Sequence, residues 1–200
     1  MKQTYSINLG GIVFNIDDDA YHHLKDYLHQ IETHFANDEE GREIMSDIET
    51  RIAELFQERI KGARQVIEMN DIIEIKKILG SPDEFGDQEN GNSGSGRKKE
   101  KFGPSSYRRI YRDPDNRILG GVCSGMGAYW QIEPWIFRVI FIIFIFGAVG
   151  PIIYLILWIV IPEAKTAAQK LEMKGEPVNI SNIGKTVKEE FQNVKDRMNL

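Results

Sequence analysis

Apolar and polar residues alternate near the start of the chain. The alternation runs through residues 5–9 and 12–16, on either side of Gly10 and Gly11. A period of two is typical of strands with one buried face, and two glycines supply the positive φ angles of a two-residue turn. The pattern therefore predicts a β-hairpin. The aspartates at 17–19, directly after it, favour the start of a helix.

Helical spacing replaces the alternation after residue 19. Apolar residues recur there at intervals of three and four in three stretches, as in amphipathic helices. The three stripes are Leu24, Tyr27, Leu28, Ile31 and Phe35; Ile44, Ile48, Ile52, Leu55 and Phe56; and Ile72, Ile75, Ile78 and Leu79. We expect the second helix to end near Lys61 and Gly62, a short strand at 66–69, and a cap for the third helix at Asn70 or Asp71. Residues 1–86 are thus predicted to form a small α+β domain of order ββααβα.

One long apolar run lies in the last third of the chain. Residues 139–161 contain no charged residue, and 17 of these 23 residues are Ile, Leu, Val or Phe. A continuous helix of this length would reach ~34 Å, enough for a hydrocarbon core of ~30 Å. The run therefore predicts a transmembrane helix.

Glycine and proline interrupt this run in its middle. Gly147, Gly150 and Pro151 weaken a helix and permit either a kink or a tight turn. In a hairpin each arm would reach only ~18 Å, which is too short to span a bilayer. We therefore expect one kinked span, with a re-entrant hairpin as the alternative.

The tail, residues 164–200, is polar except for one stripe near its end. Thr186 and Glu189 have the spacing of a capping box, and apolar residues follow one another at helical intervals. An amphipathic helix of this kind needs a partner, which can be another helix, the N-terminal domain or the bilayer interface. We favour a partner protein, and the residues assigned to binding it are Ile183, Val187, Phe191, Val194 and Met198.

Charge divides the chain more sharply than its net value of −5 suggests. Residues 1–90 carry 20 acids and 9 bases, a net charge of −11, whereas residues 97–138 carry 9 bases and 4 acids, a net charge of +5. Residues 87–106 are rich in Gly, Ser and Asn and are expected to form a flexible basic linker. The chain passes from Met1 directly into alternating residues without a signal peptide, so the apolar run is expected to act as the targeting signal. More bases precede that run than follow it, which places the N-terminal domain in the cytoplasm by the positive-inside rule.

Candidate catalytic and metal-binding residues are few. Cys123 is the single cysteine and lies among glycines, so a packing role is expected rather than that of a nucleophile. His22, Asp26 and His29 share one face of the first predicted helix, but nothing completes a zinc site. A solvated surface is therefore preferred over a membrane-bound metal hydrolase. We expect no enzymatic activity, no cofactor, no metal and no nucleic-acid partner.

Small residues dominate the stretch between the linker and the apolar run. Gly121 and Gly125 have the small-xxx-small spacing that allows close approach between helices, and Pro134 suits the first turn of a helix. Arg138, at the start of the apolar run, is expected to be an interfacial anchor. The alternative is that Arg138 pairs with Glu133 or with a lipid phosphate.

Residues 107–163 resemble the phage-shock protein C (PspC) family. Residues 117–126 (RILGGVCSGM) carry the resemblance, and Phe141 continues it. The residues expected to form the membrane and packing motif are Gly120, Gly121, Cys123, Gly125, Tyr129, Pro134, Arg138, Gly147, Gly150, Pro151, Tyr154, Trp158 and Pro162. The N-terminal domain lies outside the region of resemblance.

The resemblance implies a bacterial inner-membrane protein of the envelope-stress response that is not an enzyme. Its implied partners are the lipid bilayer and a PspA-like coiled-coil effector or other membrane stress proteins. We therefore expect a stress sensor or adaptor that binds regulatory partners through its N-terminal domain and its tail. The alternative is a structural anchor that forms homo-oligomers through the glycine motif and displays the N-terminal domain.

Overall fold

The computed structural model describes residues 3–60, 65–81, 108–145 and 150–198, in two compact units. The head unit comprises residues 1–103 together with 179–200, and the hairpin unit comprises residues 104–178. The C-terminal segment therefore belongs with the N-terminal domain, although the hairpin unit separates the two in sequence. The linker predicted at 87–106 lies outside the described residues.

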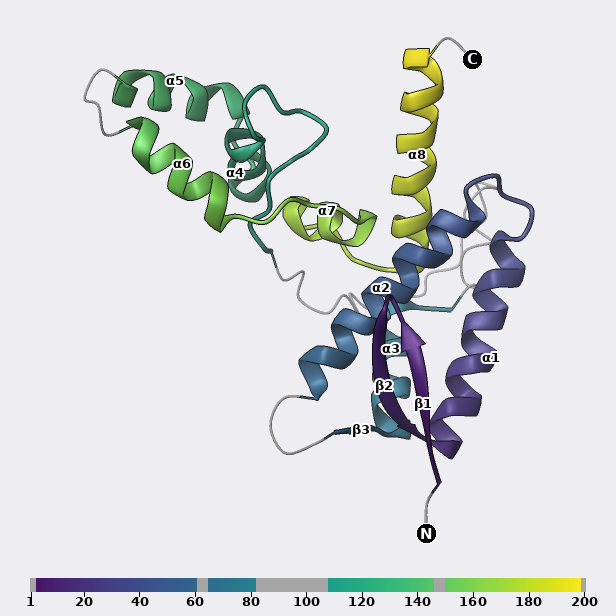
Figure 1. Cartoon of the computed structure of the whole chain (residues 1–200). Helices are drawn as coiled ribbons and strands as arrows, with labels where there is room; N and C mark the ends of the chain where they lie inside the picture. The colour runs from purple at the N-terminus through teal and green to yellow at the C-terminus, as the bar shows by residue number, and fades with distance from the viewer. Residues whose placement is uncertain (1–2, 61–64, 82–107, 146–149, 199–200) are drawn as a thin grey trace, which may run out of the picture. The chain divides into compact units, whose positions relative to one another are not determined.

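The N-terminal part of the head unit has the predicted order ββααβα (Figure 1). Its elements are β1 (Thr4–Leu9), β2 (Ile12–Asp17), α1 (Asp18–Phe35), α2 (Gly41–Arg59), β3 (Val66–Ile67) and α3 (Met69–Leu79). The strand order is β1-β2-β3, with β1 and β2 antiparallel and β2 and β3 parallel. Gly10 and Gly11 have φ angles of 55° and 82° between the paired residues Leu9 and Ile12, so the predicted hairpin turn is confirmed.

Apolar side chains of the predicted stripes form the core of this domain. Ile31, Ile52 and Ile75, one from each helix, are fully buried. The expected cap of α3 is wrong, because the N-cap residue is Glu68. Asp71 lies three residues further on and accepts a hydrogen bond from the Glu68 backbone N–H at 2.9 Å. The aspartate thus stabilises the helix start from within the first turn.

Helix α8 (Ile180–Met198) completes the head unit by packing against α2. Its residues Ile180, Ile183 and Val187 are buried, whereas Val194 and Met198 are exposed. The sequence allows three partners for the apolar stripe of the tail: another helix, the N-terminal domain and the bilayer interface. In the structure, the N-terminal domain covers the first half of this stripe.

The start of α8 approaches the turn between α1 and α2 closely. A Cβ atom added at Gly184 would lie 3.1 Å from the ring of Phe35, so a larger residue would force the ring to move. Two ion pairs join the same elements, from Lys188 to Asp38 at 3.0 Å and from Lys195 to Glu39 at 2.7 Å. Lys195 holds the pKa of the Glu39 carboxyl below its ordinary value, through a hydrogen bond first and charge attraction second.

The hairpin unit contains α4 (Val122–Trp130), α5 (Pro134–Ile145), α6 (Gly150–Val160) and α7 (Ala167–Lys174). Helices α5 and α6 lie side by side in opposite directions (Figure 1), and the rings of Phe141 and Tyr154 meet edge to face at 5.3 Å. The prediction of one kinked helix through 139–161 is therefore wrong. The apolar run forms two short helices, as in the re-entrant alternative. Within the described ranges, none of the helices has both the length and the apolar character required to cross a bilayer.

The tail predicted at residues 164–200 contains the two helices α7 and α8, and the predicted apolar stripe lies on α8. Thr166 caps α7 by accepting a hydrogen bond from the backbone N–H of Gln169, and Gly175 ends it with a φ angle of 74°. A threonine followed three residues later by glutamine is a recognised start signal for a helix.

Candidate functional site

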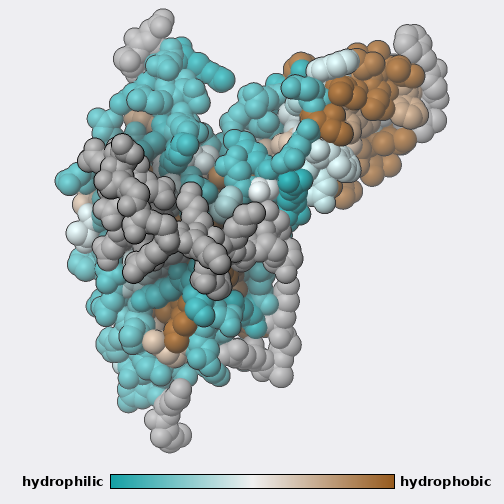
Figure 2. All heavy atoms as spheres, turned by 180° about the vertical axis from the view of Figure 1, so that it is seen from behind, coloured by the Kyte–Doolittle hydropathy of each residue, from teal (hydrophilic) through white to brown (hydrophobic). Residues whose placement is uncertain are grey.

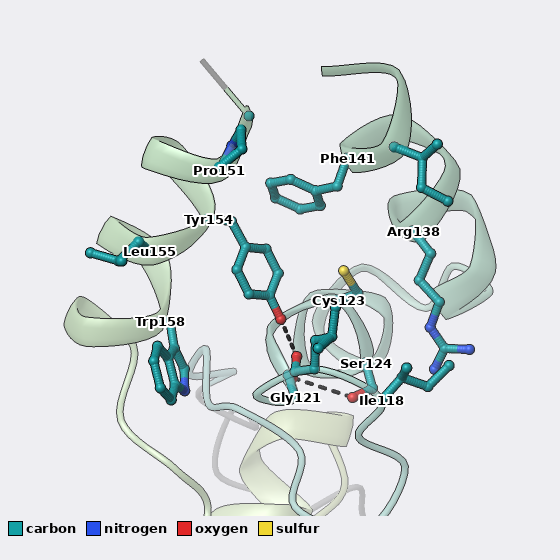
Figure 3. Close-up of a pocket in the computed structure, with 13 residues that line it drawn as sticks. Ile118, Gly121, Cys123, Ser124, Arg138, Phe141, Pro151, Tyr154, Leu155 and Trp158 are labelled. Carbon is teal, nitrogen blue, oxygen red and sulfur yellow. Dashed lines mark hydrogen bonds between the residues drawn. The ribbon is translucent and has the colours of Figure 1, made fainter. Parts of the chain in front are cut away.

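Most residues of the predicted motif surround one cavity in the hairpin unit. The cavity has a volume of ≈ 580 Å³ and lies between α4, α5 and α6 (Figure 3). The motif residues that line it are Gly121, Cys123, Arg138, Gly150, Pro151, Tyr154 and Trp158. These residues lie up to 37 positions apart in sequence, so the folding of the apolar run into a hairpin brings them together.

The wall of this cavity is mostly apolar, and the side-chain hydroxyls in it form hydrogen bonds with backbone carbonyls of the protein itself. The Tyr154 hydroxyl donates a hydrogen bond to the Leu119 carbonyl, and the Ser124 hydroxyl donates one to the Gly121 carbonyl at 3.2 Å (Figure 3). Apolar side chains such as Phe141 supply most of the remaining surface. The cavity therefore suits a hydrocarbon ligand better than a polar one.

Arg138 and Cys123 are two further polar residues that line the cavity. The guanidinium Nη2 of Arg138 donates to the Asn116 carbonyl at 3.3 Å, which places it at the base of the hairpin. The Cys123 sulfur points between α5 and α6 in Figure 3. Burial raises the pKa of this thiol, while the nearby Arg138 charge acts in the opposite direction. A thiol with a raised pKa is a poor nucleophile.

The glycines of the motif allow close approach within the hairpin unit itself. A Cβ atom at Gly121 or Gly125 would lie less than 3.0 Å from the backbone carbonyl of Asp113 or Tyr111, respectively. A Cβ atom at Gly120 would lie 2.8 Å from the ring of Trp158. The small-xxx-small spacing is therefore used by α4 against the chain segment that precedes it.

Arg112 joins the chain segment before α4 to the segment that follows α6. Its Nε donates to the Ile161 carbonyl at 2.9 Å, and its Nη1 donates to the Gly120 carbonyl at 3.2 Å. Its backbone N–H donates to the Pro162 carbonyl at 2.8 Å, and its Nη2 lies 3.6 Å from Glu163. The local sequence pattern does not predict this role of Arg112, because nothing in it shows that residues 112 and 162 are neighbours.

Buried charged residues attach α7 to the chain segment around residues 111–115. Glu172 is 3% exposed and accepts a hydrogen bond from the Tyr111 hydroxyl at 3.1 Å. Lys170, which is also buried, pairs with Asp115 at 2.9 Å. Burial, followed by the charge of Glu172, raises the pKa of Tyr111, so this phenol stays protonated as a donor. These contacts make α7 part of the hairpin unit.

The outer surface of the hairpin is apolar on nearly every side. Ile143 is 64% exposed on α5 and Ile159 is 72% exposed on α6, and Figure 2 shows this surface as a brown patch. The other large exposed apolar residues of these helices are Trp135, Val139, Ile140, Ile142, Phe144, Ile152, Ile153, Leu155, Ile156, Trp158 and Val160. Soluble monomers rarely expose a contiguous apolar patch of this kind, so the patch indicates an interaction surface.

The remaining predicted residues have simpler places. Pro134 begins α5, as expected, and the carbonyl of Tyr129 accepts a hydrogen bond from Arg108 at 3.4 Å. Gly147 lies outside the described residues. Among the ion pairs of the described residues, none joins Arg138 to Glu133. In the head unit, the exposed histidines His22 and His29 lie 3.5 Å and 3.7 Å from carboxylates of their own helix.

Comparison with protein families gives one result, which lies within the hairpin unit. Residues 108–164 match the family model of the PspC domain. No curated protein and no solved structure matches the chain. The matched range contains the cavity, the glycine contacts and the whole apolar hairpin. Residues 108–164 are therefore similar to the PspC domain, which suggests a membrane-associated stress-response family, and a separate α+β arrangement precedes them.

Proposed function

We propose that this protein is a non-catalytic adaptor of an envelope-stress response. Its α5–α6 hairpin inserts into one leaflet of a membrane, and its head unit and tail lie together in the aqueous phase. The PspC domain supports the stress-response context. The observation that carries the membrane part is the exposed apolar surface of the hairpin.

The hairpin has the polarity of a membrane insertion with a defined depth. Its tip contains apolar residues such as Ile143 and Ile152, whereas Trp135, Arg138 and Trp158 lie towards the base. Tryptophan and arginine prefer the interface between water and hydrocarbon. Helices of 12 and 11 residues reach ~18 Å, slightly more than half of a ~30 Å hydrocarbon core. The length thus fits one leaflet.

The position of α8 supports the same topology. The hairpin unit separates α8 from the rest of the head unit in sequence, yet α8 packs against α2 and buries Ile183 and Val187 there. A chain that crossed the bilayer once would leave α2 and α8 on opposite sides. A hairpin that enters and leaves through the same face allows the observed packing.

The adaptor role follows from what remains available for partners. The head domain is strongly acidic, and the last turns of α8 expose Val194 and Met198. We propose a coiled-coil effector of the PspA type as the partner, in a bacterial inner membrane with the head unit on the cytoplasmic side. The excess of bases before the hairpin favours that orientation.

Single-cysteine labelling in cells tests the topology. Cys123→Ser removes the only native cysteine, and Lys25→Cys on α1, Gln192→Cys on α8 and Phe144→Cys near the hairpin tip are then introduced singly. A membrane-impermeant maleimide should label positions 25 and 192 from the same side and should fail to label position 144 from either side. Labelling of 25 and 192 from opposite sides would exclude the hairpin topology.

A zero-length carbodiimide cross-linker adds a test of the head unit in intact membranes. It joins an amine to a carboxylate in direct contact, and the Lys195–Glu39 pair at 2.7 Å is suited to it. Mass spectrometry should find a peptide linking residues 39 and 195. Lys195→Arg keeps the charge but cannot form this amide link, so it is the matched control. Capture of a coiled-coil protein with the full chain, but not with a chain lacking residues 179–200, tests the adaptor role.

A further inference from the structure

We propose that the cavity between α4, α5 and α6 is a binding site for one phospholipid, with an acyl chain inside the cavity and the phosphate on Arg138. This inference rests on the proposed insertion of the hairpin into a leaflet. It goes further, because a hairpin can insert without selecting any individual lipid.

The cavity has the size and chemistry of an acyl-chain site. Its volume of ≈ 580 Å³ lies within the range of ~300–1,000 Å³ that is typical of small-molecule sites. Phe141, Leu155 and Trp158 supply apolar walls from both helices of the hairpin (Figure 3). The hydroxyls of Tyr154 and Ser124 already donate hydrogen bonds to backbone carbonyls, so these donors are not available to a polar ligand.

Arg138 is the charged residue among those that line the cavity. The hydrogen bond from Arg138 to the Asn116 carbonyl is long, at 3.3 Å, and none of the described carboxylates forms an ion pair with this guanidinium. A guanidinium presents a planar fork of donors that matches a phosphate group. Because Arg138 lies towards the base of the hairpin, its height corresponds to the headgroups when the tip lies among the acyl chains.

The charges around this position favour a lipid with a net negative charge. Arg112 and Arg117 share one carboxylate, that of Glu163, at 3.6 Å and 3.7 Å. Residues 108–138, which lead into the hairpin, carry five arginines and three acids, a net charge of +2. We therefore commit to an anionic phospholipid, with phosphatidylglycerol as the probe and zwitterionic phosphatidylcholine as the comparison.

Native mass spectrometry of the full chain in detergent micelles containing either lipid measures retention. The wild-type protein should retain one phosphatidylglycerol in preference to phosphatidylcholine. Arg138→Gln should lower this retention roughly five- to tenfold, the size of one basic residue's attraction to an anionic headgroup. Lys165→Gln is the matched control, because it removes one positive charge from an exposed side chain of the hairpin unit that does not line the cavity, and it should leave retention near the wild-type value. Equal losses in both variants would show a diffuse charge effect and overturn the site.

Two substitutions at Cys123 test the place of the acyl chain. The thiol points into the cavity, so Cys123→Leu should fill part of it and displace the lipid, whereas Cys123→Ser should not. Circular dichroism and tryptophan emission establish that each variant is folded. Arg138→Lys, which keeps the charge and loses the fork, should retain an intermediate amount of lipid. Full retention by a folded Cys123→Leu protein would overturn the proposal.

Flotation with vesicles separates this inference from the proposed function. If the wild-type chain fails to float with vesicles of phosphatidylcholine and phosphatidylglycerol, membrane insertion itself is refuted. If the wild-type chain floats but retains no lipid selectively, insertion stands and the phospholipid site is refuted.

Discussion

The packing of α8 on the head domain predicts a large and specific effect of Ile183→Ala. Ile183 is fully buried, and the substitution removes ~3 methylene-sized groups, each worth ~0.8 kcal/mol. The transfer term alone is therefore ~2.4 kcal/mol, and the cavity left beneath α8 raises the loss towards ~4 kcal/mol. A loss of this size changes the population of detached α8 by roughly fifty-fold or more.

Hydrogen exchange of the full chain in nanodiscs measures this effect at α8. Amides of residues 183–195 should exchange much faster in Ile183→Ala than in the wild type. Val194→Ala is the matched control, since Val194 lies on the same helix and is 52% exposed. Its effect should stay within ~0.5 kcal/mol. If both variants exchange alike, or if Ile183→Ala leaves α8 protected, then α8 does not derive its stability from the head domain.

Three further predictions concern the interior of the two units. Gly125→Ala should destabilise the hairpin unit by at least ~1–3 kcal/mol, because the new Cβ meets the Tyr111 carbonyl; unchanged thermal unfolding, followed by the tryptophans that all lie in that unit, would contradict this close packing. Tyr154→Phe should cost ~1 kcal/mol in the same assay, since a backbone carbonyl loses its donor. Burial, followed by the charge of Glu32, raises the pKa of the Glu49 carboxyl in the folded head unit. The contribution of this carboxyl to the stability of the head unit is therefore fully present below the carboxyl's ordinary pKa, and it is lost as the pH rises through the folded-state pKa. Glu49→Gln should therefore stabilise the head unit slightly at pH 7 and leave it unchanged at pH 3, and a gain that persists at pH 3 would contradict this titration.

The head domain was predictable because its sequence signals agree with its tertiary contacts. Alternation around two glycines produces the hairpin of β1 and β2, and three apolar stripes supply three helices for one small sheet. The error at the start of α3 arose because glutamate is not among the favoured N-cap residues, whereas aspartate is. Asp71 does act at the helix start, but from inside the first turn.

The hairpin was less predictable, because a run that is apolar on all sides has no period from which to read a tertiary contact. Gly150 and Pro151 permit a turn as well as a kink, and each arm of a hairpin is too short to span a bilayer. Contacts between residues far apart in sequence distinguish the hairpin from a kinked helix. Phe141 contacts Tyr154, and Arg112 binds the carbonyls of residues 161 and 162. Seven residues of the predicted motif line one cavity, and that cavity depends on those long-range contacts.

The tail shows why an apolar stripe does not identify its own partner. The head surface that meets α8 at Gly184 includes Phe35, and the charges that pair with α8 come from Asp38 and Glu39 in the turn between α1 and α2. A partner that needs the whole stripe must therefore displace the head domain, and its affinity is reduced by the stability of that contact. A partner that uses only the last turns of α8 meets no such competition. Phe35→Ala separates the two cases, because it weakens the head contact at Gly184 without changing the stripe: it favours the first kind of partner and leaves binding of the second kind unchanged.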